Sequence, residues 1–145
     1  MDRLDWQHLF FRFDGRINRA KYWLVILINV VTVLAAAFLF VIPGLGWIWI
    51  LFAVVVLAAI YVGIAVAVKR LHDRNKSGLW LLLFYLVPAV LQGIAGDDFS
   101  GINLVLNIAG GAISLWALVE LGFLRGTAGA NDYGPDPLET AFERA

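Results

Sequence analysis

The chain has 145 residues, of which 61% are hydrophobic and 15% are charged, and its formal net charge is zero. Soluble globular proteins have about 45–50% apolar and about 25% charged residues. This composition therefore argues against a water-soluble enzyme, a disordered tail and a nucleic-acid-binding arm. The chain contains no Cys, which excludes disulfides and thiolate sites. We predict an integral membrane protein that forms a single membrane domain over residues 1–145.

The first 21 residues are expected to precede the membrane. Residues 4–13 read LDWQHLFFRF, and at helical spacing their aromatic side chains share one face. This pattern predicts a short helix that lies in the membrane interface. The alternative is an extended segment whose aromatic residues anchor the first span. Gly15 then permits the chain to turn toward the bilayer.

Four apolar stretches follow in chain order, at residues 22–42, 46–68, 79–95 and 102–124. A bilayer core of about 30 Å needs about 20 apolar residues as a helix. All four must be helical because the bilayer core offers the backbone no water. Pro43 and Gly44 predict a tight turn between the first two spans. Asn29 and Asn107 are expected to hydrogen-bond between helices. The predicted fold class is all-α, a four-helix membrane bundle.

The basic residues predict the orientation. All eleven Lys and Arg residues fall in three segments, 1–21, 69–78 and 125–145, which lie on one side of the four spans. The opposite side carries Asp97 and Asp98 and no basic residue. The positive-inside rule therefore places the three basic segments and both termini in the cytoplasm.

The loop 69–78 reads KRLHDRNKSG and contains four basic residues. Its charges either serve topology alone or form a site for anionic headgroups, because guanidinium groups match phosphate oxygens two at a time. His72 beside Asp73 suggests catalysis or metal binding. However, adjacent helical residues point about 100° apart, so a structural hydrogen-bonded pair is the preferred interpretation. We predict no catalytic residue, no metal site and no cofactor.

Glu120 is the charged residue of the last span, and it precedes Arg125 by five residues, or about 7.5 Å of helix rise. An acid just beneath the membrane interface normally has a partner. The expected structural ion pair is Glu120 with Arg70. The alternative partners are Lys69, Arg16 and Arg19.

The last basic segment contains GTAGANDYGPDP at residues 126–137. Three Gly, two Pro and one Asn in twelve residues exclude a helix and predict a series of turns. We expect this segment to fold back across the ends of the helices. It acts either as a structural plug or as an anion-binding concavity of backbone N–H groups.

Three segments together resemble a known family: FDGRINRAKYW at 13–23, RLHDRNKSGLW at 70–80 and GTAGANDYGPDP at 126–137. They resemble the small bacterial inner-membrane proteins of the YhaH and YhaI type, which share domain of unknown function eight hundred and five. Leu79 before Trp80 and Ala128 in the first turn depart from the family pattern. The resemblance implies a multi-pass protein of the bacterial inner membrane and implies no particular activity.

These segments predict one composite cytoplasmic surface. The expected function is a non-enzymatic membrane protein whose basic face binds anionic lipid headgroups or a protein partner, with no role for nucleic acid. One alternative is a small transporter or channel component that acts as a homo-oligomer. Another is a membrane enzyme on phosphorylated lipid. The candidate anion- or headgroup-binding residues are Arg16, Arg19, Arg70, His72, Asp73, Arg74, Asn131 and Tyr133.

Overall fold

The computed structural model describes residues 10–39, 48–97 and 99–139. Within these ranges the chain is helical apart from turns and one isolated bridge between Asn131 and Gly134. The predicted all-α class, with four helices, is confirmed. The elements are α2 (Arg19–Phe38), α3 (Ile48–Asp73), the π-helix η2 (Leu82–Leu86), α4 (Val87–Ala95), α5 (Gly101–Leu118) and the π-helix η3 (Val119–Phe123).

Three helices are long and apolar enough to cross a membrane: α2, α3 and the continuous helix from α5 through η3. The helix over Leu82–Ala95 is apolar but shorter. α2 begins where Asn18 caps it, since its side-chain oxygen accepts a hydrogen bond of 2.9 Å from the backbone N–H of Lys21.

The helix boundaries differ from the predicted spans at one informative place. α3 continues to Asp73, five residues past the predicted end at 68, so the first half of the expected loop is helical. The predicted turn at 43–45 and most of the predicted helix at 4–13 lie outside the described residues. Phe10 and Phe11, at the end of that segment, are helical.

One of the two π-helical segments, η2, has a local cause in the sequence. In η2 the N–H of Val87 donates to the carbonyl of Leu82, five residues earlier. Pro88 has no N–H, so the carbonyl of Phe84 lacks its ordinary donor and the helix widens at this point. η3 ends in the same way, with a 3.1 Å bond from the N–H of Leu124 to the carbonyl of Val119.

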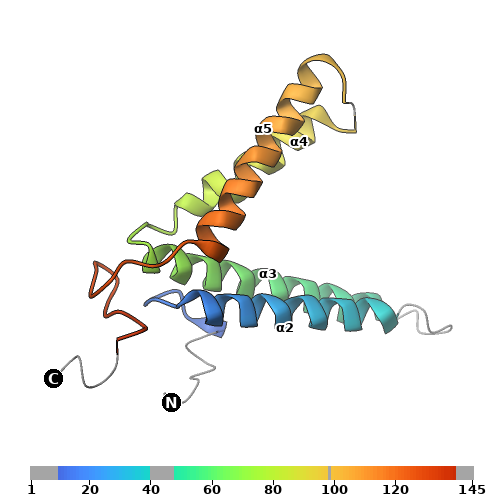
Figure 1. The fold of residues 1–145 in the computed structure, drawn as a ribbon. Coiled ribbons are helices and arrows are strands. Elements are labelled where there is room, and N and C mark those ends of the chain that lie inside the picture. Colours follow the sequence, from blue (N-terminus) through green and yellow to red (C-terminus); the bar gives the residue numbers. More distant parts are fainter. Residues whose placement is uncertain (1–9, 40–47, 98, 140–145) are drawn as a thin grey trace.

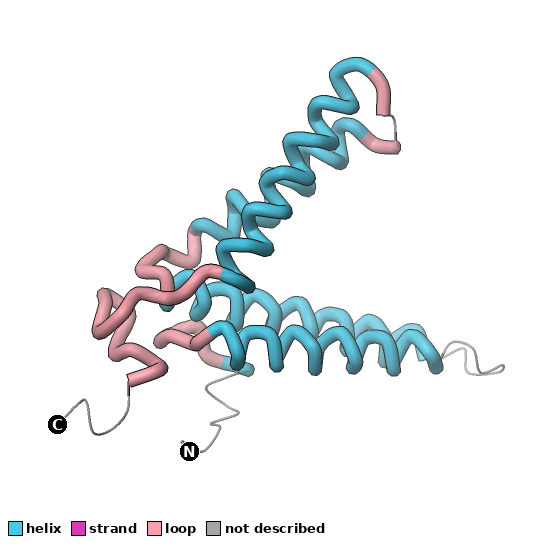
Figure 2. The backbone as a smooth tube through the Cα atoms, in the orientation of Figure 1, coloured by secondary structure: helices cyan, strands magenta, loops and turns pink. Residues whose placement is uncertain are grey.

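The helices form two antiparallel hairpins, α2–α3 and α4–α5, which meet at one end and diverge toward the other (Figure 1). The turns before α2, after α3 and after η3 gather at the end where the hairpins meet (Figure 2). The buried apolar core lies at this end and includes residues from all four helices and the segment before α2, namely Ile17, Tyr22, Val25, Val62, Val66, Ala67, Leu71, Phe84, Ala117 and Leu121.

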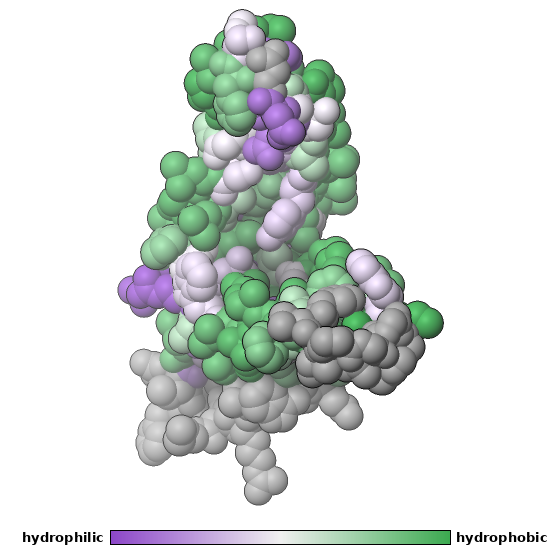
Figure 3. Space-filling model, turned by 90° about the vertical axis from the view of Figure 1, so that its right-hand side faces the viewer, coloured by the Kyte–Doolittle hydropathy of each residue, from purple (hydrophilic) through white to green (hydrophobic). Residues whose placement is uncertain are grey.

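Away from the meeting point the surface is mostly hydrophobic (Figure 3). Leu34, Leu57 and Ile108 are each more than 60% exposed, as expected for side chains that face lipid tails. Within the first hairpin the Asn29 Nδ2 donates to the carbonyl of Ala59 at 3.1 Å, which confirms the interhelical bond expected for this residue.

Candidate functional site

Asp73, the last residue of α3, is the centre of a buried polar cluster where the hairpins meet. Its side chain is 4% exposed. One carboxylate oxygen accepts from Arg16 Nε and Nη2, both at 3.1 Å, and the other accepts from Arg70 Nη1. Arg70 lies three residues earlier on α3, so the helix itself places the two side chains on one face. Asp73 therefore joins the segment before α2 to the end of α3.

Arg16 uses its whole guanidinium inside the protein. Besides its two bonds to Asp73, Nη2 donates to the carbonyl of Thr127 at 2.7 Å, and Nη1 donates to the carbonyls of Gly129 at 2.7 Å and Gly134 at 3.2 Å. A guanidinium has five N–H donors, and here each has an acceptor. Arg16 therefore fixes the C-terminal turns onto the helix ends and has no donor left for a ligand.

The end of the last helix is covered by side chains from the first hairpin. A helix leaves its last carbonyls without backbone partners. Here the carbonyls of Leu121 and Leu124 accept from Arg70 Nε and Nη2. The carbonyl of Gly122 accepts from Trp23 Nε1 at 2.9 Å, and that of Phe123 accepts from Arg19 Nη1 at 3.2 Å. The carbonyl of Arg125 accepts from Arg74 Nη1 at 2.6 Å.

Five successive carbonyls, residues 121–125, are therefore satisfied by donors from α2, α3 and the turn that follows it. We call this group the carbonyl run. Three arginines supply four of the five bonds, which suits the partial negative charge at a helix C-terminus. The carbonyl run ties the second hairpin to the first, because each donor comes from the first hairpin or the turn after α3.

Glu120 has different partners from the one predicted. Its carboxylate is 4% exposed and lies 2.8 Å from Arg74 Nε and 2.7 Å from Lys76 Nζ. The expected pair with Arg70 is corrected, because Arg70 pairs with Asp73 instead. The extension of α3 to Asp73 explains the change, since it turns Arg70 toward Asp73 and leaves Arg74 and Lys76 at the start of the turn.

His72 and Asp73 do not act as a pair. His72 Nδ1 is 3.2 Å from the carbonyl of Gly15, and its ring stacks on Tyr133 with centroids 3.9 Å apart. Asn131 Nδ2 donates to the carbonyl of His72 and to Thr127 Oγ1, both at 2.8 Å. These contacts hold the imidazole between Gly15 and the C-terminal turns, and none of them involves the Asp73 carboxylate.

The C-terminal segment folds back across the helix ends, as the sequence predicts. Thr127 N–H donates to the carbonyl of Asp73 at 2.8 Å. A Cβ added to Gly126 would overlap the Asp73 carboxylate, so this position needs glycine. Backbone N–H groups of Leu138 and Gly129 donate to Asp136 and hold the pKa of that carboxyl below its usual value.

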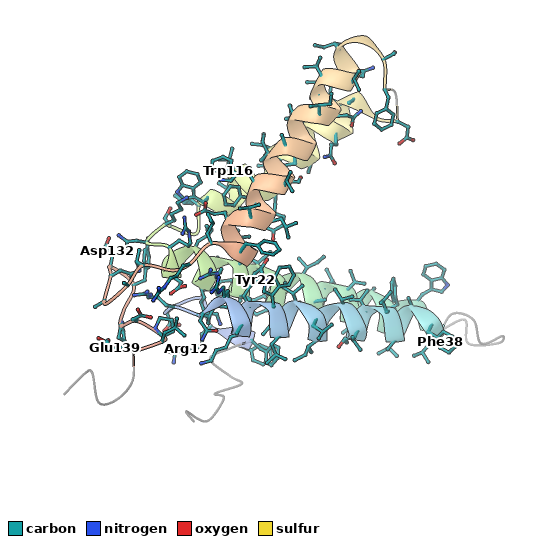
Figure 4. All side chains as sticks on the ribbon, viewed as in Figure 1. Arg12, Tyr22, Phe38, Trp116, Asp132 and Glu139 are labelled. Atoms are coloured by element: carbon teal, nitrogen blue, oxygen red, sulfur yellow. The ribbon has the colours of Figure 1, made fainter. Side chains whose placement is uncertain are left out.

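The structure thus brings all eight candidate residues to one end of the molecule, where Arg12, Asp132 and Glu139 also lie (Figure 4). Their burial differs, and His72, Arg74, Asn131 and Tyr133 are partly buried. Arg16, Arg70 and Asp73 are enclosed, whereas Arg19 is exposed and donates one bond to the protein. Arg125, which the sequence reasoning did not select, is also exposed, two residues from the carbonyl that Arg19 contacts.

Arg19 and Arg125 share a further property. Neither forms an ion pair with a carboxylate of the described residues, in contrast to Arg16, Arg70 and Arg74. Both stand at a border between a spanning helix and a turn, because Arg19 begins α2 and Arg125 follows η3. Among the described residues no group of three or more His, Asp or Glu side chains could hold a metal ion.

Comparison with known proteins gives a consistent result over most of the chain. The family described as Protein of unknown function (DUF805) matches residues 10–135. The chain is 30% identical to the uncharacterized protein YiiR of Escherichia coli K12, over 94% of this chain and 93% of YiiR. It is 32% identical to the inner membrane protein YhaI (86% of this chain, 85% of YhaI) and 31% identical to the inner membrane protein YhaH (86% of each), both from the same strain. No solved structure gave a significant match.

Proposed function

The chain belongs to the DUF805 family, and from that premise we propose that it is a non-enzymatic, multi-pass protein of the bacterial inner membrane whose basic end binds anionic lipid headgroups. The observation that carries the proposal is the pair of exposed guanidinium groups of Arg19 and Arg125 beside the carbonyl run. Neither forms an ion pair with a described carboxylate, and both stand at the end of a spanning helix. Guanidinium groups are well matched to phosphate oxygens.

The proposal gives the other candidate residues a supporting part. Arg16, Arg70 and Asp73 hold the hairpins together, and His72, Asn131 and Tyr133 hold the C-terminal turns in place. Arg74 is shared between Glu120 and the carbonyl run. This division favours the interpretation of the C-terminal segment as a structural plug. It assigns binding of the lipid headgroup to the exposed arginines.

The orientation is part of the proposal. We place the basic end and both termini in the cytoplasm, because nine basic residues of the described ranges lie at this end, against six acidic ones. Anionic lipid is attracted to such clusters at about 1 kcal/mol per basic residue. Fusing an alkaline phosphatase or a green fluorescent protein to the C-terminus tests the orientation, since we expect fluorescence and no phosphatase activity.

Headgroup binding is tested on the delipidated full-length protein by native mass spectrometry, with phosphatidylglycerol or phosphatidylcholine added. We expect phosphatidylglycerol to bind more tightly, and Arg19→Gln or Arg125→Gln to weaken it about fivefold, the equivalent of about 1 kcal/mol. Arg12→Gln is the matched control because Arg12 is exposed at the same end but already pairs with Asp14 at 3.2 Å. Equal binding of both lipids, or equal losses in all three variants, would refute the proposal.

A further inference from the structure

A cavity lies between the two hairpins, and the Val68 that lines it is five residues before Asp73 on α3. It has a volume of about 640 Å³ and is lined on one side by Ile60, Ile64 and Val68 of α3, and on the other by the segment 78–86. This volume is within the range of about 300–1,000 Å³ that is usual for small-molecule sites. Its lining runs about 12 Å along α3, from Val68 next to the polar end to Ile60 deeper in the membrane.

A second, smaller hollow of about 180 Å³ is also lined by Tyr85, which belongs to the lining of both. Its lining includes Tyr22 and Ser114, together with apolar residues of η2, α5 and η3. Tyr22 is only 6% exposed and lies where the hairpins begin to diverge (Figure 4). Among the described residues, the hydroxyls of Tyr22, Tyr85 and Ser114 form no hydrogen bond; Tyr22 is buried, whereas Tyr85 is 53% exposed and Ser114 is exposed.

No buried side-chain oxygen of the described residues lacks a partner, so these hydroxyls open onto the two hollows, where they can donate to an occupant that offers acceptor oxygens. The apolar cavity next to them favours an occupant with a hydrocarbon chain. The position of the basic residues adds a third requirement. Arg19 lies one helical turn before Tyr22 on α2, and its Nη1 donates to the carbonyl of Phe123, two residues beyond Leu121, which lines the hollow.

A glycerophospholipid meets these three requirements. Its ester carbonyls offer acceptor oxygens, its acyl chain is a hydrocarbon, and its phosphate is anionic. We propose that the space between the hairpins binds one acyl chain of an anionic phospholipid, whose ester group accepts hydrogen bonds from Tyr22 and Tyr85 while its phosphate meets Arg19. This inference rests on the proposed function and specifies where the lipid lies. A second copy of the chain is the competing occupant, but bilayer lipid is as apolar as another helix and gives no hydrophobic drive for that association.

The test uses the full chain in nanodiscs that contain phosphatidylglycerol with a diazirine in one acyl chain. After irradiation, we expect cross-linked peptides from residues 60–68 and 78–86. Ile64→Trp places an indole ring in the cavity and should reduce the yield of these cross-links. Leu27→Trp is the control, because Leu27 is 60% exposed on α2 and lines neither hollow. Tyr85→Phe removes only a hydroxyl and should reduce the cross-link yield, whereas Tyr133→Phe should not.

The outcomes separate this inference from the headgroup proposal. Cross-links spread evenly over the exposed faces of all four helices would overturn the acyl-chain site, and so would a stable dimer that excludes the lipid. A preference for phosphatidylglycerol that is unaffected by Ile64→Trp would also overturn it, and would leave headgroup binding at Arg19 intact. Equal cross-linking by a phosphatidylcholine probe at the same peptides would support the acyl-chain site and refute the charge preference.

Discussion

Replacing Asp73 with Asn tests whether the buried cluster holds the two hairpins together. The substitution keeps the shape of the side chain but removes its charge, so Arg16 and Arg70 lose their shared carboxylate. Three hydrogen bonds from guanidinium groups end on this carboxylate, which is 4% exposed. Removing one partner of a buried ion pair costs about 3–5 kcal/mol, because the remaining charge is left uncompensated. We expect the free energy of unfolding to fall by that amount.

Reversible unfolding in mixed micelles, followed by tryptophan fluorescence, measures this loss. Asp132→Asn is the matched control, since Asp132 is exposed at the same end and its described hydrogen bond, to Asn75 Oδ1, comes from its backbone N–H. Changes at such surface positions are usually within about 0.5 kcal/mol. A loss of less than about 1 kcal/mol for Asp73→Asn, the value of an exposed ion pair, would refute the role assigned to the cluster.

Three further predictions use the same region. Gly126→Ala would place a methyl group in the Asp73 carboxylate, and we expect a loss of about 1–3 kcal/mol in the same unfolding assay. Glu120→Gln removes a buried carboxylate from two basic partners, and a loss of about 1–3 kcal/mol is expected; a neutral result would show that the pair is not needed for folding. Backbone N–H groups lower the pKa of Asp136. Its ionised carboxylate therefore stabilises the C-terminal turns at any pH above the usual aspartate pKa, and this stabilisation is lost as the pH falls through the lowered pKa. The amide resonance of Gly129 should titrate with a midpoint below 3.8, and a midpoint at or above 3.8 would contradict this assignment.

The sequence was sufficient to predict the helices because apolar stretches of about 20 residues with at most one charge have few alternatives. It also predicted that the three motif segments meet at one end, since all of them lie on the same side of the four spans. Both predictions depend only on the order and length of segments. The prediction that Glu120 pairs with Arg70 was wrong for another reason. Pairing between helices depends on the rotation of each helix about its axis, which decides which side chains face one another.

Two of the missed features did leave signals in the sequence. Arg70 and Asp73 are three residues apart, so extending α3 to Asp73 would have placed them on one face and left Glu120 to Arg74. Pro88 inside a predicted span marks the place where η2 widens. The carbonyl run left no such signal, because its donors come from residues about 50 to 100 positions away and only the tertiary structure brings them to one helix end.

The basic residues therefore have more than one physical task, and burial decides which task each performs. Positive charge at one end of the spans orients a membrane protein whether or not the charge is neutralised. A guanidinium that is enclosed with carbonyls and a carboxylate, as in Arg16, has no donor left for a ligand. An exposed guanidinium that forms no ion pair, as in Arg19 and Arg125, keeps most of its donors, since Arg19 uses Nη1 for the carbonyl of Phe123. A count of arginines thus overstates the binding capacity of this surface, and the lipid contact must be sought at its border with the membrane, where the exposed arginines stand.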